Sequence, residues 1–492
     1  MSDQSRQLPS TPNLRFLKVQ AKRRLADGEF TSLHDAQLAI AREHGFSSWT
    51  TLKLAVDGEQ SSALNQVRWL VTRFVDARRP EWTAPDENEI RAHFHERFLT
   101  TVPLDTLITN LSTVAQPQPA ELTVTRAGAD HVRAQLGDVR IEAATETGNP
   151  GLFSALRLYP VGSRVTDPRI ADPRIVLSGD VPESAVDLAE TSMAELGLPG
   201  LVLAGGTRPW VITRGWADLN QREPLRAGHR FPAYGITKLI TATVVLRLAG
   251  AGQVDLDAPA STYLRSVRLA DDATTVRELL THTAGVTGPA AQFAEHVPDQ
   301  AELLGAVVAI DGRGTFKASN AGYAVLGQLI ADVTGASSYP DAARELVLAP
   351  LGMADSSFPS SWPASNAIRG YHLAQDGSFE PADTLVYTMT AAGGLWTTAA
   401  DLVRFGTGWS TLLPAELAED AVRPHAAQQA EGAKVGLGWL CNPAAGVYGH
   451  PGAGRGAASS LIVRADSGAV TVALTNRLVP VEPVNAALSR AV

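Results

Sequence analysis

Residues 231–238 read Phe-Pro-Ala-Tyr-Gly-Ile-Thr-Lys, and this short stretch decides how the rest of the chain is interpreted. A predominantly apolar run, residues 239–248, follows it without a break. A run that is apolar on nearly every side predicts a helix buried in a core rather than one lying on a surface. Lys238 stands at the start of this helix, in a chain with only six lysines among its 42 basic residues.

Five further stretches follow in order along the C-terminal part of the chain. They are residues 276–285 (Val-Arg-Glu-Leu-Leu-Thr-His-Thr-Ala-Gly), 350–353 (Pro-Leu-Gly-Met), 392–402 (Ala-Gly-Gly-Leu-Trp-Thr-Thr-Ala-Ala-Asp-Leu), 436–439 (Gly-Leu-Gly-Trp) and 449–452 (Gly-His-Pro-Gly).

Together these stretches resemble the serine β-lactamase, penicillin-binding-protein and esterase superfamily, in particular its class C and esterase branch. The resemblance implies an α+β fold, with an antiparallel sheet flanked by helices and accompanied by an all-helical lobe. We expect this β-lactamase-like domain to span residues 180–492.

Two smaller parts are expected before it. Apolar residues at helical spacing predict a short helical head within residues 1–58. Residues 63–162 show helical periodicity and then alternating strands separated by turns, which predicts a small α+β domain with an antiparallel meander. This domain resembles the cone-shaped steroid-isomerase (NTF2-like, SnoaL) domains. Its position before a β-lactamase-like domain resembles proteins of clavulanic-acid gene clusters. These N-terminal parts are also candidate surfaces for a homodimer, in which the partner is a second copy of this chain.

The superfamily's first motif is Ser-x-x-Lys, in which the serine attacks a carbonyl and the lysine helps to take its proton. Here Lys238 is present, but Gly235 occupies the position of the nucleophile. Glycine has no side chain and cannot form an acyl-enzyme. Lys238 is therefore either a catalytic base without its partner or a remnant that pairs with Asn320 or a backbone carbonyl.

The second motif, Tyr-x-Asn, normally carries the acid/base tyrosine of this branch. Asn320 is kept, but Ala318 occupies the position of the tyrosine. Shifting the motif by one residue would bring Lys317 into that role. The match of residues 319–323 to the motif argues against such a shift. Two losses favour natural departure from acyl-enzyme chemistry over one engineered substitution.

The third motif is kept as His450-Pro451-Gly452. A glycine there allows the backbone to approach a ligand closely. In relatives, the amide of the nucleophile residue and one just past this motif form the oxyanion hole. We therefore expect the N–H groups of Gly235 and Ala453 to polarise a carbonyl here.

Three other side chains are candidates for the same cleft. Tyr234 adjoins the vacated position and is the nearest phenol, so it is the best substitute acid, with simple packing as the alternative. His450 is either a proton-transfer group or a wall residue. Trp396 is expected to line the cleft, because it interrupts a Gly-rich segment at the edge of the site.

Composition excludes several classes of function. The net charge of −9 offers no electrostatic footprint for nucleic acid or an anionic membrane. No apolar run is long enough to span a bilayer, and the polar N-terminal residues lack the apolar segment of a signal peptide, so we expect a cytoplasmic protein. A single cysteine and the lack of an Asp/Glu/His cluster predict no metal and no cofactor.

Three hypotheses for the function follow. The first is a small-molecule enzyme that holds a carbonyl-containing ligand without a covalent bond, with Lys238, Tyr234 or His450 moving a proton in an isomerase, lyase or cyclase reaction, possibly in secondary metabolism. The second is a serine hydrolase of the esterase, amidase or β-lactamase type seen as a Ser-to-Gly variant. The third is a non-catalytic ligand-binding pseudoenzyme.

Overall fold

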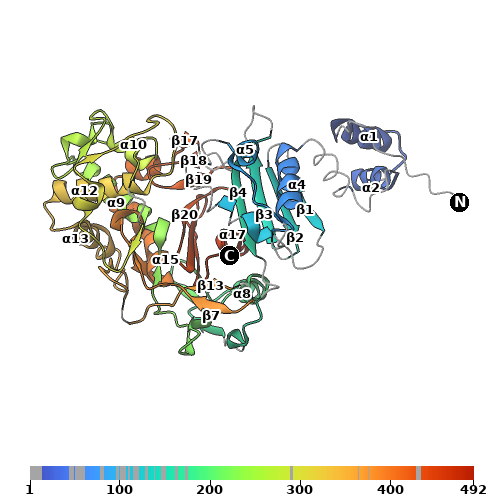
Figure 1. Ribbon diagram of the computed structural model, residues 1–492. Helices are drawn as coiled ribbons and strands as arrows, with labels where there is room; N and C mark the ends of the chain where they lie inside the picture. Colours follow the sequence, from blue (N-terminus) through green and yellow to red (C-terminus); the bar gives the residue numbers. More distant parts are fainter. Residues whose placement is uncertain are drawn as a thin grey trace. The chain divides into compact units, whose positions relative to one another are not determined.

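The computed structural model forms two compact units, Met1–Val161 and Gly162–Val492, which are described separately (Figure 1). It describes residues 14–30, 32–43, 49, 61–77, 82–95, 99, 107–108, 111–114, 121–127, 131–137, 139–145, 151–160, 165–171 and 175–492, except 289–291, 364, 375 and 428–433. Among these residues, no helix has both the length and the apolar character needed to cross a membrane.

The C-terminal unit is built on one antiparallel sheet. Its strands run in the order β17-β18-β19-β20-β21-β22-β6-β7-β5, and β8 adds to β7. Their bounds are β5 Ile175–Ser178, β6 Gly200–Gly205, β7 Trp210–Asp218, β8 Glu223–Pro224, β17 Ala426–Ala427, β18 Lys434–Val435, β19 Leu440–Asn442, β20 Val447–Gly454, β21 Ala457–Arg464 and β22 Val470–Thr475.

The central strands of this sheet are buried on both faces. Every residue of β6 and β22 is buried, and alternate residues enter two different cores, as expected for a pleated strand covered on both sides. Helices α8 (Glu183–Leu196) and α17 (Glu482–Ala491) pack on one face. Helix α15 (Ala399–Gly408) packs on the other. Strand β20 of this sheet packs on η4, the turn that leads into the helical lobe.

Helix α9 (Thr237–Gly250) forms the centre of that lobe. Its side chains are buried almost all the way round, because α12, α13 and α14 surround it. The predicted buried helix is thus present, and the 3₁₀ turn η4 (Tyr234–Ile236) leads directly into it. The other helices of the unit are α10 Val276–Leu280, α11 Gln300–Leu304, α12 Asn320–Thr334, α13 Tyr339–Ala343, α14 Thr390–Gly393 and α16 Ala415–Ala421, with 3₁₀ turns η3 Pro168–Ile170, η5 Ala260–Thr262 and η7 Trp409–Leu412 and the π-turn η6 Arg344–Leu348.

Short strand pairs tie the lobe's loops together. They are β9 (Phe231–Pro232) with β16 (Trp396–Thr397), β10 (Arg268–Leu269) with β12 (Val307–Val308), β11 (Phe293–Ala294) with β15 (Val386–Tyr387) and β13 (Tyr371–Leu373) with β14 (Phe379–Pro381).

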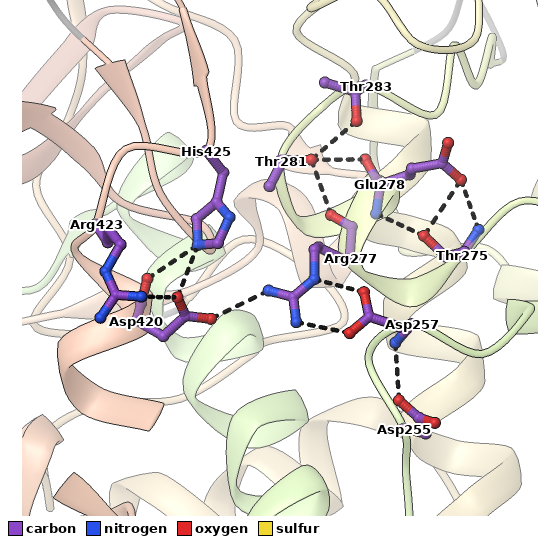
Figure 2. A network of polar contacts seen from close by, with 10 residues as sticks. All are labelled: Asp255, Asp257, Thr275, Arg277, Glu278, Thr281, Thr283, Asp420, Arg423 and His425. Atoms are coloured by element: carbon purple, nitrogen blue, oxygen red, sulfur yellow. Dashed lines mark hydrogen bonds and ion pairs between the residues drawn. The ribbon is translucent and has the colours of Figure 1, made fainter. Parts of the chain in front are cut away.

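Arg277 joins three segments of the lobe (Figure 2). Its guanidinium donates to Asp257 at 2.7 Å and to Asp420 of α16 at 3.1 Å. A capping box between Thr275 and Glu278 starts α10 at the same place. This network holds α10 in one orientation, and with it the chain that runs on from α10 towards the cleft.

The N-terminal unit contains a helix-then-meander region. Its sheet has the order β1-β2-β3-β4, and α4 packs on β2 and β3. The bounds are α4 Ser62–Phe74, α5 Glu87–Arg91, η1 Ser112–Val114, β1 Leu122–Ala127, β2 His131–Leu136, β3 Val139–Thr145 and β4 Phe153–Pro160. Helices α1 (Leu14–Ala26) and α2 (Leu33–Glu43) have a small core of their own. The predicted break between a head and a middle domain falls outside the described residues and stays a prediction.

A Pro- and Asp-rich segment, residues 166–173, precedes the expected start of the β-lactamase-like domain, and its described residues belong to the C-terminal unit. Asp167 is buried there, accepts the backbone N–H of Phe379 at 2.8 Å, and pairs with Arg169. These interactions lower the pKa of Asp167 to about 2, with the Arg169 hydrogen bonds as the main cause. The described part of this segment is therefore an integral element of the fold.

The acid stability of the C-terminal unit should depend on Asp167. Its folded-state pKa lies below the ordinary 3.8, so its stabilisation is complete above about pH 4 and is lost as the pH falls towards 2. We expect Asp167→Asn to lower the free energy of unfolding by about 2 kcal/mol at pH 7 and much less at pH 2.5. Urea unfolding of both proteins at the two pH values measures this. An equal difference at both would contradict the ion-pair explanation.

Candidate active site

The candidate site lies where β20 runs along η4, just before the start of α9. Gly235 and Lys238 are one helical turn apart there, so both face the same side. A cavity of about 240 Å³ opens beside them. Its walls are Tyr234, Gly235, Lys238, Gln292, Phe293, Asn320, Tyr387, Ala392, Gly393 and the strand residues Pro451, Gly452, Ala453 and Gly454.

Strand β20 fills the space that a side chain at Gly235 would need. A Cβ atom built on Gly235 would lie 2.4 Å from the carbonyl oxygen of Pro451 and 2.9 Å from Cε1 of His450. A Cβ atom on Gly452 would lie 2.1 Å from the carbonyl oxygen of Ala233. Real Cβ contacts are longer than this, so the two glycines allow the strand and the turn to come together. Position 235 has no room for a serine unless the backbone shifts.

Lys238 is buried at the wall of the cavity. Its ammonium donates to the carbonyl of Ala392 at 3.1 Å, and Nζ lies 5.8 Å from the centre of the Tyr323 ring. Burial lowers the pKa of Lys238 to about 8, because the charged form loses its hydration. Of the two partners considered for a remnant lysine, the backbone carbonyl is therefore the one that it contacts. Its pKa also places it within reach of a proton-transfer role at neutral pH.

A buried hydrogen-bond network holds the α14 turn that carries this carbonyl. The Thr241 hydroxyl donates to the carbonyl of Ala391 at 2.6 Å and contacts the Tyr339 hydroxyl at 2.7 Å. The neighbouring backbone N–H of Leu395 donates to the Thr237 hydroxyl at 3.2 Å. Threonines of α9 thus fix α14, and so fix the acceptor of Lys238.

Two histidines lie close to Lys238. Nδ1 of His450 donates to the carbonyl of Pro451 at 2.5 Å, and its ring faces Gly235 without lining the cavity. Desolvation, and then the positive charge of Lys238, lower the pKa of His450 to about 3. Desolvation, Lys238 and His450 also lower the pKa of His282 far below its ordinary value. Both imidazoles are therefore neutral, and His450 is placed as a wall behind Gly235 rather than as an acid.

Tyr234 forms part of an aromatic corner. Its hydroxyl donates to the carbonyl of Arg455 at 3.2 Å, and burial raises the pKa of the phenol. Its ring meets those of Phe293 and Tyr387 edge-on, with centroids 6.2 and 6.4 Å away. The backbone at Tyr234 has φ +44°, a strained value for a bulky residue, which turns the chain into α9. A phenol engaged in this way supports packing over the role of substitute acid.

Tyr387 is a second phenol of the cavity that sequence reasoning missed. Strand β15 pairs with β11, which sets Tyr387 opposite Phe293. The Tyr387 hydroxyl donates to the Gln292 side chain at 3.4 Å, and burial raises its pKa while a hydrogen bond with Asn320 lowers it. The only sequence signal was the position of Tyr387 shortly before the Gly-rich stretch at 392–394, and that signal is weak.

Trp396 and Lys317 lie away from the cavity. Trp396 sits in β16 opposite Pro232, packs edge-on against Trp362 at 4.7 Å and is not among the residues that line the cavity. Its expected role in the cleft stays a prediction. Lys317 pairs with Asp311 at 3.8 Å, and Ala318 is exposed, so neither replaces the missing tyrosine.

No group of three acidic, histidine or cysteine side chains with metal-binding geometry occurs in the described parts of either unit. The remaining predicted residues, Lys238, Gly235, Asn320, Gly452 and Ala453, all line the one cavity described above. Their chemical roles stay predictions.

Comparisons with known proteins now place the C-terminal unit. The family model described as Beta-lactamase matches residues 185–491, which is more than half of the chain. The chain belongs to the β-lactamase family. This membership confirms the predicted fold class for the C-terminal part, while the steroid-isomerase-like character of the N-terminal domain stays a prediction.

Relatives within the family differ in their described roles. The chain is 30% identical over 283 residues to penicillin-binding protein 4 of Amycolatopsis lactamdurans, covering 50% of this chain and 72% of that protein. It is 30% identical over 224 residues to esterase EstB of Burkholderia gladioli, covering 40% and 55%.

The fold is shared with solved structures of the same family. A penicillin-binding protein from Bacillus halodurans superposes with a TM-score of 0.55 at 21% identity, covering 63% of this chain and all of that one. A class C β-lactamase gives 0.53 at 21% identity, covering 62% and 95%. At these identities the likeness bears on the fold alone.

Proposed function

We propose that this protein is a non-covalent enzyme for a small carbonyl compound, in which Lys238 transfers a proton next to the carbonyl. One combination of features carries the proposal. Strand β20 occupies the space that a nucleophile side chain at position 235 would need, yet the buried Lys238 still lines a cavity. Loss of the serine alone would suggest that the site has lost its catalytic function. The cavity and the low lysine pKa support retained chemistry.

The reaction begins with neutral Lys238 accepting a proton from the carbon beside the carbonyl. The electron pair of the broken C–H bond forms a C–C double bond, and the carbonyl π pair moves to the oxygen. N–H groups of Gly235 and Ala453 and the amides of Gln292 and Asn320 are available to stabilise that oxygen. Return of the proton to another carbon completes an isomerisation, and loss of a leaving group completes an elimination.

The two alternatives differ in what they require of the site. A hydrolase seen as a Ser-to-Gly variant needs room at position 235, and a Cβ atom there would lie 2.4 Å from a backbone oxygen. A non-catalytic binding protein needs only the cavity. The resemblance to proteins of antibiotic gene clusters supports a substrate from secondary metabolism, and the expected cytoplasmic location is compatible with it.

Deuterium wash-in tests the proposal directly. We expect the protein in D₂O to exchange the acidic C–H of 1-phenylbutane-1,3-dione or phenylacetone faster than buffer does, as followed by NMR. Because only neutral Lys238 accepts a proton, the rate should rise with pH and level off above about 8. A rate that falls as the pH rises from 6 to 8 would contradict the base role. Binding of these ketones without any exchange would favour the non-catalytic alternative.

A further inference from the structure

The cavity combines a buried cation with an aromatic wall, and this combination points to one class of ligand. We infer that the site is selective for a planar, ring-bearing oxyanion, a phenolate or an aryl-conjugated enolate, with its charged oxygen at Lys238 and its ring against Tyr234, Phe293 and Tyr387. The inference rests on the proposed function, because the enolate is the species that the proton transfer would form.

The first observation is that Lys238 has no counter-charge. Its side chain is more than nine-tenths buried and faces the cavity. Among the residues that the structure describes, no carboxylate pairs with it, and its hydrogen bond to the Ala392 carbonyl uses one of three donors. Buried charges in proteins are normally paired. An anionic oxygen in the cavity would supply the missing partner.

The second observation is the sign of the surrounding charge. None of the described residues that line the cavity is acidic. The two histidines close to Lys238, His282 and His450, are both neutral and supply no negative charge to it. Arg455 lies at the Phe293 side, with its guanidinium 5.3 Å from the centre of that ring, and pairs with Asp383. The site therefore favours an anion over a neutral or cationic ligand.

The third observation is the group of aromatic side chains in the cavity wall. Phe293 and Tyr387 meet edge-on with centroids 5.2 Å apart, and Tyr234 closes the corner. Aromatic walls of this kind hold flat rings by stacked or edge-on contacts, each worth a fraction of the total affinity. The Asn320 and Gln292 side chains at the Tyr387 hydroxyl add hydrogen-bonding partners beside the ring. A flat ring that carries one anionic oxygen satisfies both walls at once.

A substrate of this class also pairs the two opposite charges that the proton transfer creates. When Lys238 takes the C–H proton it becomes an ammonium ion at the moment when the carbonyl oxygen becomes negative. The ion pair formed in this step raises the pKa of Lys238 and draws the proton transfer forward. A ring conjugated with the new double bond spreads the charge further.

The probe for this inference is 4-nitrophenol, whose phenolate form absorbs visible light and whose binding requires no turnover. With the full-length protein at pH 7 we expect the absorbance of the phenolate to increase on binding. We also expect binding at least tenfold tighter than that of 4-nitrotoluene, which lacks the oxygen, or of acetate, which lacks the ring.

Two variants locate the binding. Lys238→Met should remove the tenfold preference for 4-nitrophenol over 4-nitrotoluene, whereas Lys317→Met, which changes a half-buried lysine that pairs with Asp311 outside the cavity, should keep it. In the wild type alone, affinity should rise along a series of phenols of increasing acidity, so the test survives if Lys238→Met does not fold. Equal binding of 4-nitrophenol and 4-nitrotoluene would overturn the inference. Tight phenolate binding with no deuterium exchange on any ketone would keep it and reject the enzyme.

Discussion

Lys238→Met is expected to slow deuterium exchange on an accepted ketone by a factor of about 10² to 10⁴, the usual contribution of a positioned general base. Methionine is similar in length and apolar, so it fills the same space without the buried amine. Removal of a buried charge that has no carboxylate partner in the described structure should leave the free energy of unfolding unchanged or raise it. The loss of rate would then report chemistry and not folding.

The matched control for this experiment is Lys317→Met, in which the same substitution is made outside the cavity. We expect it to retain the wild-type rate and pH profile. NMR wash-in rates and thermal unfolding should be measured on all three proteins. A Lys238→Met protein that folds and exchanges at the wild-type rate would show that Lys238 is not the base.

Gly235→Ser is expected to yield a less stable protein that still fails to form an acyl-enzyme. The new Cβ atom would lie 2.4 Å from the carbonyl oxygen of Pro451, so β20 or η4 has to move. Overpacking of this kind usually costs about 1–3 kcal/mol of the free energy of unfolding. The acid/base tyrosine of relatives is also missing at Ala318, so the serine would have no phenol at that position to take its proton.

Gly228→Ser is the matched control, because a Cβ atom on Gly228 meets nothing within 4 Å. We expect it to unfold like the wild type. Urea unfolding measures the stability, and mass spectrometry after treatment with a fluorophosphonate probe detects a phosphonylated serine, which forms when the serine oxygen displaces fluoride from phosphorus. If Gly235→Ser were as stable as Gly228→Ser and carried the adduct, the site would be a hydrolase with one residue missing.

Much of the fold was predictable because the sequence motifs of the family are short and continuous along the chain. The buried α9, the α10 segment with its capping box and the Gly-rich turn at α14 each depend on neighbours within a few residues. The site was predictable to the same extent. Lys238, Gly235, Asn320, Gly452 and Ala453 belong to such segments, and all of them line the cavity.

The differences between expectation and structure have a common physical origin. Trp396 was expected in the cleft because of its neighbours in the chain, but it pairs with Pro232, more than 160 residues away, and is not among the residues that line the cavity. Tyr387 and Gln292 were missed for the same reason, because only the β11–β15 pairing brings them to Asn320. Strand pairing between distant segments leaves almost no trace in the local pattern of residues.

By itself, the sequence determined the family, the absence of a nucleophile hydroxyl at position 235 and the survival of its lysine partner, since these follow from side-chain identity within local motifs. Only the tertiary structure decided that β20 occupies the vacated space, that Lys238 lies in a cavity wall with no carboxylate among the described lining residues, and that an aromatic corner lines the same cavity. These features depend on how closely separate elements approach one another, and that is set by packing over the whole unit.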